Sequence, residues 1–347
     1  MKKRILFILF SLFTIISLAS CSNKKNYFKL WNDCDSLNVL KDYVADVTNK
    51  KSKNYIPVED RIATFDMDGT FVGELYPTYF EYNLLEYRVL DDPTYKDKAP
   101  ADVVETATNI REFVRNNVAL PDHFDMKHAY AAAKAYSGMT LKEFDTYVKD
   151  YARKDVNGFE GMTYAESFYR PMLEVFKFLE AYDFTYYVVS GSDRFICRAL
   201  VDSLGIEPNR VIGMDVVLKS TEQDTDGVSY TMKSNEKLIR TDELIIKNLK
   251  TNKVKQIAQE IGKVPVLSFG NSGGDSAMHN YCMSNEKYKT ATFMLVADDA
   301  EDDYANLDKA AKLKDEWIKS GYNVISMKDD FKTIYGDKVK KTKFVFN

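Results

Sequence analysis

The chain has 347 residues, of which 45% are hydrophobic and 29% are charged, and its formal net charge at pH 7 is −4. This length is sufficient for one large domain with an insertion or for two domains. Positive and negative side chains are mixed along the sequence, so no basic face is indicated and we expect no nucleic-acid partner. Nothing in the sequence predicts a protein partner.

The N-terminus is typical of an export signal. A positive start (residues 2–4) precedes an almost wholly apolar run (5–18), and small residues then lead to Cys21. The ending resembles a bacterial lipobox, in which the cysteine becomes the lipidated first residue. We therefore expect a lipoprotein signal peptide (1–20), a tether (21–30) and a protein that is exported and lipid-anchored to a bacterial membrane, facing the periplasm. The alternative, an uncleaved anchor helix, is disfavoured because the run is short.

Cysteine and histidine spacings give little sign of a disulfide framework or a metal pair. Three further cysteines show no CxxC spacing: Cys34, Cys197 and Cys282. A framework of disulfides is not expected from an odd number, although a single bridge stays open. The histidines lack the i, i+4 spacing of a helical metal pair and are interpreted as structural or surface residues: His123, His128 and His279.

Short apolar runs alternate with helix-like segments over most of the chain. Strands are predicted at 61–66, 184–190, 211–218, 264–270 and 291–297, with a weaker one at 322–327. Helices are predicted between them, among others at 171–183 and 237–262. Such alternation is typical of a parallel sheet that is covered by helices on both faces, which places the chain in the α/β class.

The segment 75–160 interrupts this alternation because it shows helical patterns only. Helices are predicted there at 78–92, 100–118, 125–137 and 140–156. We therefore expect an α/β core (31–74 and 161–347) with an all-helical cap (75–160) inserted after its first strand. Gly158 and Gly161 give the returning backbone the freedom of a hinge. The Lys-rich ending is interpreted as a solvated terminal segment.

Two aspartates end the first predicted strand. Asp66 and Asp68 are separated by one residue, so their side chains lie on the same side of an extended chain, and Gly69 then permits a turn. In open parallel sheets, ligands bind beyond the carboxyl ends of the strands. Two close carboxylates repel each other and resist desolvation. A cation or a reaction is therefore needed to explain why both are present.

A later predicted strand ends in hydroxyl and glycine residues. The hydroxyl of Ser190, followed by Gly191 and the first backbone amides of a helix, would form a cradle for an anion. The alternative is that Ser190 or Ser192 simply caps that helix.

The strand predicted at 264–270 is followed by Asn271 and Asp275, whose oxygen atoms suit Mg²⁺ rather than zinc. Upstream, Lys253 lies in the helix that leads into this strand. By itself it would be interpreted as a surface lysine.

Together, these motifs resemble the four motifs of the haloacid dehalogenase-like (HAD) superfamily. They are Asp-x-Asp-Gly-Thr, a strand-terminal Ser-Gly, a lysine and Gly-Asn-Ser-x-Gly-Asp, in that order. The resemblance extends from about Trp31 to about Tyr281 and favours the phosphoserine-phosphatase-like branch, whose members carry a helical cap after the first motif. It implies a Rossmann-like, doubly wound parallel sheet with an inserted helical cap. It assigns the motif lysine to Lys253, with Lys255 as the competitor.

The resemblance implies a Mg²⁺-dependent phosphomonoester hydrolase. Asp66 would attack phosphorus and form an aspartyl-phosphate, while Asp68 would protonate the leaving oxygen and then deprotonate the hydrolytic water. Mg²⁺ would be bound by Asp66, the backbone carbonyl of Asp68, Asn271 and Asp275. The phosphate would be bound by Ser190, Gly191 and Lys253.

Two features of the motifs qualify this picture. Many relatives have Asp where Asn271 stands, so the predicted metal site loses one formal charge. The presence of Asp68 argues against a haloacid dehalogenase, because those enzymes do not need this acid-base partner.

The substrate is less well defined by the sequence than the reaction. The resemblance places Glu74 where related phosphatases carry an acid that contacts a substrate ammonium group, and Tyr76, Tyr79 and Phe80 lie nearby. We expect a small phosphate ester, with amine-bearing esters such as phosphoserine or phosphocholine as candidates. The alternatives are a phosphotransferase on the same scaffold and a non-catalytic solute-binding lipoprotein.

Overall fold

The structure is a computed structural model and describes residues 26–74 and 77–346. The predicted signal peptide, Cys21 and Tyr76 lie outside the described residues. Within these two ranges, no helix combines the length and the apolar character needed to cross a membrane.

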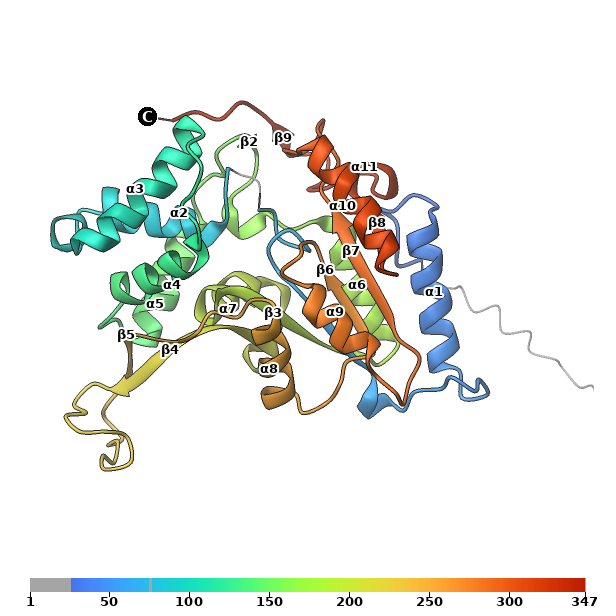
Figure 1. Ribbon diagram of the computed structural model, residues 1–347, viewed down its shortest axis with the longest axis horizontal. Coiled ribbons are helices and arrows are strands. Elements are labelled where there is room, and N and C mark those ends of the chain that lie inside the picture. Colours follow the sequence, from blue (N-terminus) through green and yellow to red (C-terminus); the bar gives the residue numbers. More distant parts are fainter. Residues whose placement is uncertain (1–25, 75–76, 347) are drawn as a thin grey trace, which may run out of the picture.

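Seven strands form one sheet in the order β5-β4-β3-β1-β6-β7-β8 (Figure 1). The strands are β1 (Ile62–Phe65), β3 (Thr185–Asp193), β4 (Val211–Ser220), β5 (Leu238–Ile246), β6 (Leu267–Gly270), β7 (Ala291–Val296) and β8 (Asn323–Ser326). All neighbours pair in parallel except β4 and β5, which are antiparallel. The predicted α/β fold with a mostly parallel sheet is confirmed.

Alternate residues of the strands pack into hydrophobic clusters on the two faces of the sheet. On one face, Phe293 of β7 joins the large cluster that contains the apolar sides of α1 (Asp35–Thr48), α6 (Arg170–Ala181) and α7 (Arg194–Val201). On the other face, Met294 packs with α10 (Leu307–Lys319). Helices α8 (Thr251–Glu260) and α9 (Ser276–Met283) cover Val189 and Ile212 on that face, and α11 (Met327–Asp330) follows β8. The period-two pattern of buried strand residues thus produces a sheet with two buried faces.

Between β1 and β3 lie the helices of the predicted insertion, which we call the insert (residues 80–152). They are α2 (Phe80–Glu86), a π-helical turn (Tyr87–Asp91), α3 (Ala101–Asn116), α4 (Phe124–Ala135) and α5 (Leu141–Ala152). Figure 1 shows them as a separate group beside the carboxyl ends of β3 and β4. Helix α5 begins with a capping box, in which Thr140 and Glu143 satisfy each other's backbone N–H groups.

The prediction of a continuous helix over 237–262 is wrong for its first half. Residues 238–246 form β5, the edge strand that runs antiparallel to β4, and only the later residues form α8. Segment 237–262 mixes charged and apolar residues in a way that fits both the helical and the strand periodicity. Pairing with β4 makes its first half a strand. The outer side of β5 also carries an isolated bridge between Ile239 and Thr140 of the insert.

The returning segment after the insert is paired with the end of the chain. Gly158 and Gly161 both have positive φ, as a hinge of glycines would, but β2 (Phe159–Glu160) between them pairs antiparallel with β9 (Lys340–Lys341). The Phe344 ring stacks on Tyr304 at 4.1 Å. The interpretation of residues 338–347 as a merely solvated tail is therefore wrong in part, because the described end of the chain packs against the hinge.

The cysteines and histidines of the described residues have structural surroundings. Cys34, Cys197 and Cys282 are free thiols. His123 is exposed, whereas His128 and His279 are buried. Burial lowers the pKa of both buried histidines to about 4, so they are neutral near pH 7.

Candidate active site

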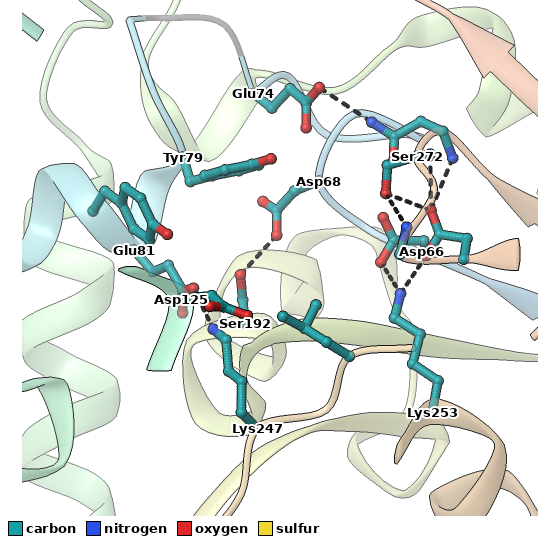
Figure 2. A pocket seen from close by; sticks show the side chains of 16 residues that line it. Asp66, Asp68, Glu74, Tyr79, Glu81, Asp125, Ser192, Lys247, Lys253 and Ser272 are labelled. Atoms are coloured by element: carbon teal, nitrogen blue, oxygen red, sulfur yellow. Dashed lines mark hydrogen bonds and ion pairs between the residues drawn. The ribbon is translucent and has the colours of Figure 1, made fainter. Parts of the chain in front are cut away.

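A cavity of about 170 Å³ lies where the carboxyl ends of β1, β3 and β6 meet the insert (Figure 2). Strand β1 is central in the sheet, with β3 on one side and β6 on the other, so residues that follow these strands converge. The core contributes four of the predicted site residues as carboxylates: Asp66, Asp68, Glu74 and Asp275. The insert contributes Glu81, Tyr82 and Asp125, and Tyr79 directly precedes its first helix.

At one side of the cavity, a lysine bridges two carboxylates. The Nζ atom of Lys253 lies 2.5 Å from Oδ1 of Asp66 and 2.7 Å from Oδ1 of Asp275, and all three residues are buried. Lys255, the competing motif lysine, is exposed. Lys253 lies in the first turn of α8, and its side chain, not that of Lys255, therefore reaches the carboxyl edge of the sheet.

The two carboxylates of this cluster differ in the direction in which their surroundings shift the pKa. Burial alone would raise the pKa of Asp275, but the Lys253 charge and hydrogen bonds from that lysine and from the Asn271 backbone hold it below the ordinary value. Burial, together with the charge of Asp275, raises the pKa of Asp66 to about 7. A cation near Asp66 would relieve this accumulation of negative charge.

Asp68 lies at the centre of the cavity and is held by a serine. Ser192 Oγ donates a hydrogen bond of 2.7 Å to Oδ2 of Asp68, while Oδ1 is buried and has no partner among the described residues. Burial raises the pKa of Asp68 to about 6, and the nearby Glu81 charge adds to that effect. A carboxyl that stays protonated up to this pH is suited to general acid catalysis.

Ser190 lies behind the cavity wall, and Gly191 and Ser192 form its surface. The Ser190 Oγ is fully buried, accepts a 3.1 Å hydrogen bond from the Ser192 backbone N–H and lies 3.5 Å from Asp68. The register between β3 and β4 shifts between Val189 and Asp193. Asp193 caps α7 by accepting a hydrogen bond from Phe195 N. The capping role considered for the serines therefore belongs to the aspartate.

Glu74 is placed over the cavity by Asn271, whose Nδ2 donates a 3.1 Å hydrogen bond to Oε1 of Glu74. Burial raises the pKa of Glu74 to about 8, with further contributions from the charges of Asp68 and Asp66. Gly69 makes this arrangement possible. It has a φ of +75°, and a Cβ atom there would lie 1.9 Å from Asn271 Nδ2.

On the insert side of the cavity, a buried ion pair joins the insert to the core. Lys247, directly after β5, donates a 2.9 Å hydrogen bond from Nζ to Oε1 of Glu81 in α2. Oε2 of Glu81 accepts a 3.2 Å hydrogen bond from the backbone N–H of Asp193. Burial opposes ionisation of Glu81, but the charge of Lys247, together with that of His128 and hydrogen bonds from Lys247 and the Asp193 backbone, keeps the pKa of Glu81 below its ordinary value.

Sequence reasoning did not single out most of these insert-side residues. Glu81, Tyr82 and Asp125 lie in helices that show no motif. Lys247 follows a strand that was predicted as a helix, and the signal that could have found it is the apolar pair Ile245-Ile246 immediately before it. Of the aromatic residues considered, Tyr79 lines the cavity, whereas Phe80 packs on Tyr151 within the insert.

The oxygen atoms at this site suit a hard cation that takes only a few of its ligands from the protein. No group of three or more His, Cys, Asp or Glu side chains within 26–74 and 77–346 is arranged to hold a metal ion. Mg²⁺ commonly uses only one or two protein carboxylates and fills its other positions with water and substrate oxygens. The orphan Oδ1 of Asp68 and the raised pKa of Asp66 indicate uncompensated negative charge here. The residues present therefore fit Mg²⁺ with Asp66 and Asp275 as carboxylate ligands.

Comparison with known proteins identifies the fold. No protein-family model and no curated protein sequence matches the chain. A conserved, functionally unknown protein from Anaerococcus prevotii DSM 20548 has a similar structure, with a TM-score of 0.53 and 15% identity over 87% of this chain and 94% of that chain. This similarity is one of fold.

Two further solved structures match less well. Cytosolic 5'-nucleotidase IIIB bound to cytidine has a TM-score of 0.47 and 12% identity over 87% of this chain and 88% of that chain. A phosphoserine phosphohydrolase-like protein from Francisella tularensis subsp. tularensis SCHU S4 has a TM-score of 0.38 and 13% identity over 73% of this chain and 92% of that chain. The seven-stranded, mostly parallel sheet with its covering helices is the Rossmann-like α/β arrangement that the sequence predicts.

Proposed function

We propose that the protein is a phosphomonoester hydrolase that works through an aspartyl-phosphate intermediate on Asp66. The observation that supports this most is the buried cluster of Asp66, Lys253 and Asp275 beside Asp68, at the carboxyl edge of a parallel sheet. A binding protein would need no carboxyl with a raised pKa next to a second, attacking carboxylate.

Each side chain has a role in the proposed reaction. Asp66 attacks phosphorus, the bond from phosphorus to the ester oxygen breaks, and Asp68 gives its proton to that oxygen. Asp68 then accepts a proton from the water that attacks the aspartyl-phosphate, which releases phosphate and regenerates Asp66. The Gly191 and Ser192 segment and Lys253 bind the phosphate oxygens, and Ser190 fixes the turn that presents them.

We propose Mg²⁺ as the cofactor, with Asp66, Asp275, Asn271 and the Asp68 backbone carbonyl as the protein ligands. When bound, Mg²⁺ reduces the repulsion between an anionic nucleophile and an anionic phosphate. Without the ion, the buried carboxylates of the site repel both one another and the substrate.

The test is phosphate release by the purified full chain from a panel of esters that includes phosphoserine, phosphocholine, phosphoethanolamine, sugar phosphates and nucleotides, with Mg²⁺ and with EDTA. We expect metal-dependent release that is absent in Asp66→Asn. In Asp68→Asn, kcat should fall by about 10²- to 10⁴-fold because leaving-group protonation is lost, while phosphate binding is retained. Unchanged turnover in Asp68→Asn, or no release from any ester, would contradict the assignment. Transfer to an added alcohol in place of water would indicate a phosphotransferase.

We also propose that the protein is exported and anchored by a lipid on Cys21. Support comes from the sequence, in which a positive start and an apolar run precede the lipobox-like ending. Incorporation of labelled palmitate in a bacterial host tests the anchor. Label should be lost in Cys21→Ser and retained in Cys34→Ser, and equal labelling of the two variants would refute the anchor.

A further inference from the structure

The cavity has two sides with different chemistry. Figure 2 shows Lys253 with Asp66 on one side, and Lys247 with Glu81 and Asp125 on the other, with Asp68 between them. The proposed reaction uses the first side and Asp68. The second side comes largely from the insert. When the phosphorus atom of an ester lies near Asp66, the leaving group would extend toward this second side.

Both cations that line the cavity are already paired with carboxylates. Within the described residues, the lining contains two lysines and six carboxylates. Lys253 is held by Asp66 and Asp275, and Lys247 is held by Glu81. A carboxylate on the leaving group would therefore enter a buried, predominantly acidic space and compete with these carboxylates for the two lysines, which is unfavourable.

The insert side instead presents aromatic rings and an unpaired acid. Tyr79 and Tyr82 meet edge to face with ring centroids 5.3 Å apart. Asp125 is half-buried in the cavity wall, and its carboxylate makes no hydrogen bond or ion pair to another described residue. Phenol rings and carboxylates together are the groups that bind alkylammonium ions.

The size of the cavity limits the leaving group further. Its volume of about 170 Å³ is below the range of about 300 to 1,000 Å³ that accommodates drug-sized ligands. A small leaving group, such as a two-carbon amino alcohol, is therefore favoured over a nucleoside.

We propose that Tyr79, Tyr82 and Asp125 form a subsite for an alkylammonium group, so that the substrate is the phosphate ester of an amino alcohol without a carboxylate, of the choline or ethanolamine class. This inference rests on the proposed hydrolase function. It separates phosphocholine and phosphoethanolamine from phosphoserine, which the reaction chemistry alone does not distinguish.

The test compares kcat/KM of the full chain for phosphocholine, phosphoethanolamine, phosphoserine and glycerol 3-phosphate. We expect one of the two amino-alcohol esters to exceed both phosphoserine and glycerol 3-phosphate by about tenfold or more, in line with the strength of desolvated cation–π contacts. Asp125→Asn should reduce this preference about tenfold through KM. Asp122→Asn, an exposed acid in the same segment, serves as the matched control and should leave the preference unchanged. Phosphoserine turnover equal to or better than that of both amino-alcohol esters, or the same preference in Asp125→Asn and Asp122→Asn, would overturn the subsite.

Binding without turnover separates this inference from the proposed function. Choline, ethanolamine and serine are titrated calorimetrically into the full chain in the presence of inorganic phosphate. Binding of choline or ethanolamine that depends on Asp125, with no hydrolysis of any ester, would support the subsite and refute the hydrolase. Absence of binding by both amines would refute the subsite, even if phosphate esters are hydrolysed.

Discussion

Lys253 is the residue on which the electrostatic balance of the candidate site depends most. Its ammonium group contacts two buried carboxylates, at 2.5 Å and 2.7 Å, and is itself 1% exposed. Because both anions are shielded from water, they depend on this cation for compensation.

Replacing Lys253 with Met should therefore lower both stability and activity. The two carboxylates would remain buried without their partner, so we expect the free energy of unfolding to fall by about 3 to 5 kcal/mol and phosphate release to be lost. Urea denaturation measures the first effect. Lys255→Met is the matched control, since this exposed residue of the same helix should change stability by less than about 0.5 kcal/mol. An unchanged denaturation midpoint for Lys253→Met would contradict the structural role.

At the residue scale, the sequence predicted the core half of the site better than the insert half. Asp66, Asp68 and Asp275 follow short apolar strands, and a parallel sheet brings such strand ends together. Glu81 lies in α2, which is buried on all sides, and Asp125 lies in the first turn of α4. In the sequence, a polar residue that faces a cavity looks the same as one that faces solvent. Only the packing of the insert against the sheet distinguishes the two.

At the scale of elements, the end of β3 depends on a glycine in its neighbour β4. A Cβ atom at Gly213 would lie 2.7 Å from Arg194 Cα and from the Ser192 carbonyl oxygen, both of which are backbone atoms. The irregular segment that presents Gly191 and Ser192 to the cavity is thus packed directly on Gly213.

We expect Gly213→Ala to destabilise the protein by about 1 to 3 kcal/mol and to lower kcat, because backbone next to Ser192 must move. Thermal unfolding and phosphate release provide the two measurements. In Gly227→Ala, the new methyl group meets only Gln223 Nε2 at 3.8 Å, so this variant should behave as the wild type. Equal behaviour of the two variants would show that the β3–β4 contact is not critical.

The elements that the sequence failed to predict are those with a weak local pattern. The helices of the insert and the parallel strands follow from local periodicity. Strand β5 mixes charged and apolar residues and is fixed by pairing with β4, and β2 and β9 are only two residues long each. The wrong helix over 238–246 in turn concealed Lys247, which directly follows a strand.

At the scale of the whole molecule, Asp303 makes stability depend on pH. It is 1% exposed, accepts hydrogen bonds from Tyr304 N and Tyr335 Oη, and lies far in sequence from the proposed site. Burial raises its pKa to about 7 in the folded protein. The unfolded chain, with an ordinary pKa near 4, binds fewer protons between these two values. The contribution of Asp303 to stability therefore falls as the pH rises from about 4 to about 7.

The variant Asp303→Asn removes this titrating group and replaces it with a side chain of similar shape. The difference in unfolding free energy between variant and wild type should shift in favour of the variant by about 2 kcal/mol or less when the pH is raised from 5 to 8. Thermal melts at the two pH values test this. The exposed Asp337→Asn serves as the control and should show no such gain. A difference between variant and wild type that is the same at both pH values would contradict a raised pKa.

The pairing of β2 with β9 also bears on the order in which the chain folds. Phe159 and Lys341 are neighbours in the structure although about 180 residues separate them. Contacts between such distant segments close large loops and form slowly. During synthesis, the insert and most of the sheet leave the ribosome before β9 exists. The orientation of the insert over the cavity is therefore expected to become fixed late, when the last strand reaches the hinge, so that a competent site is among the final products of folding.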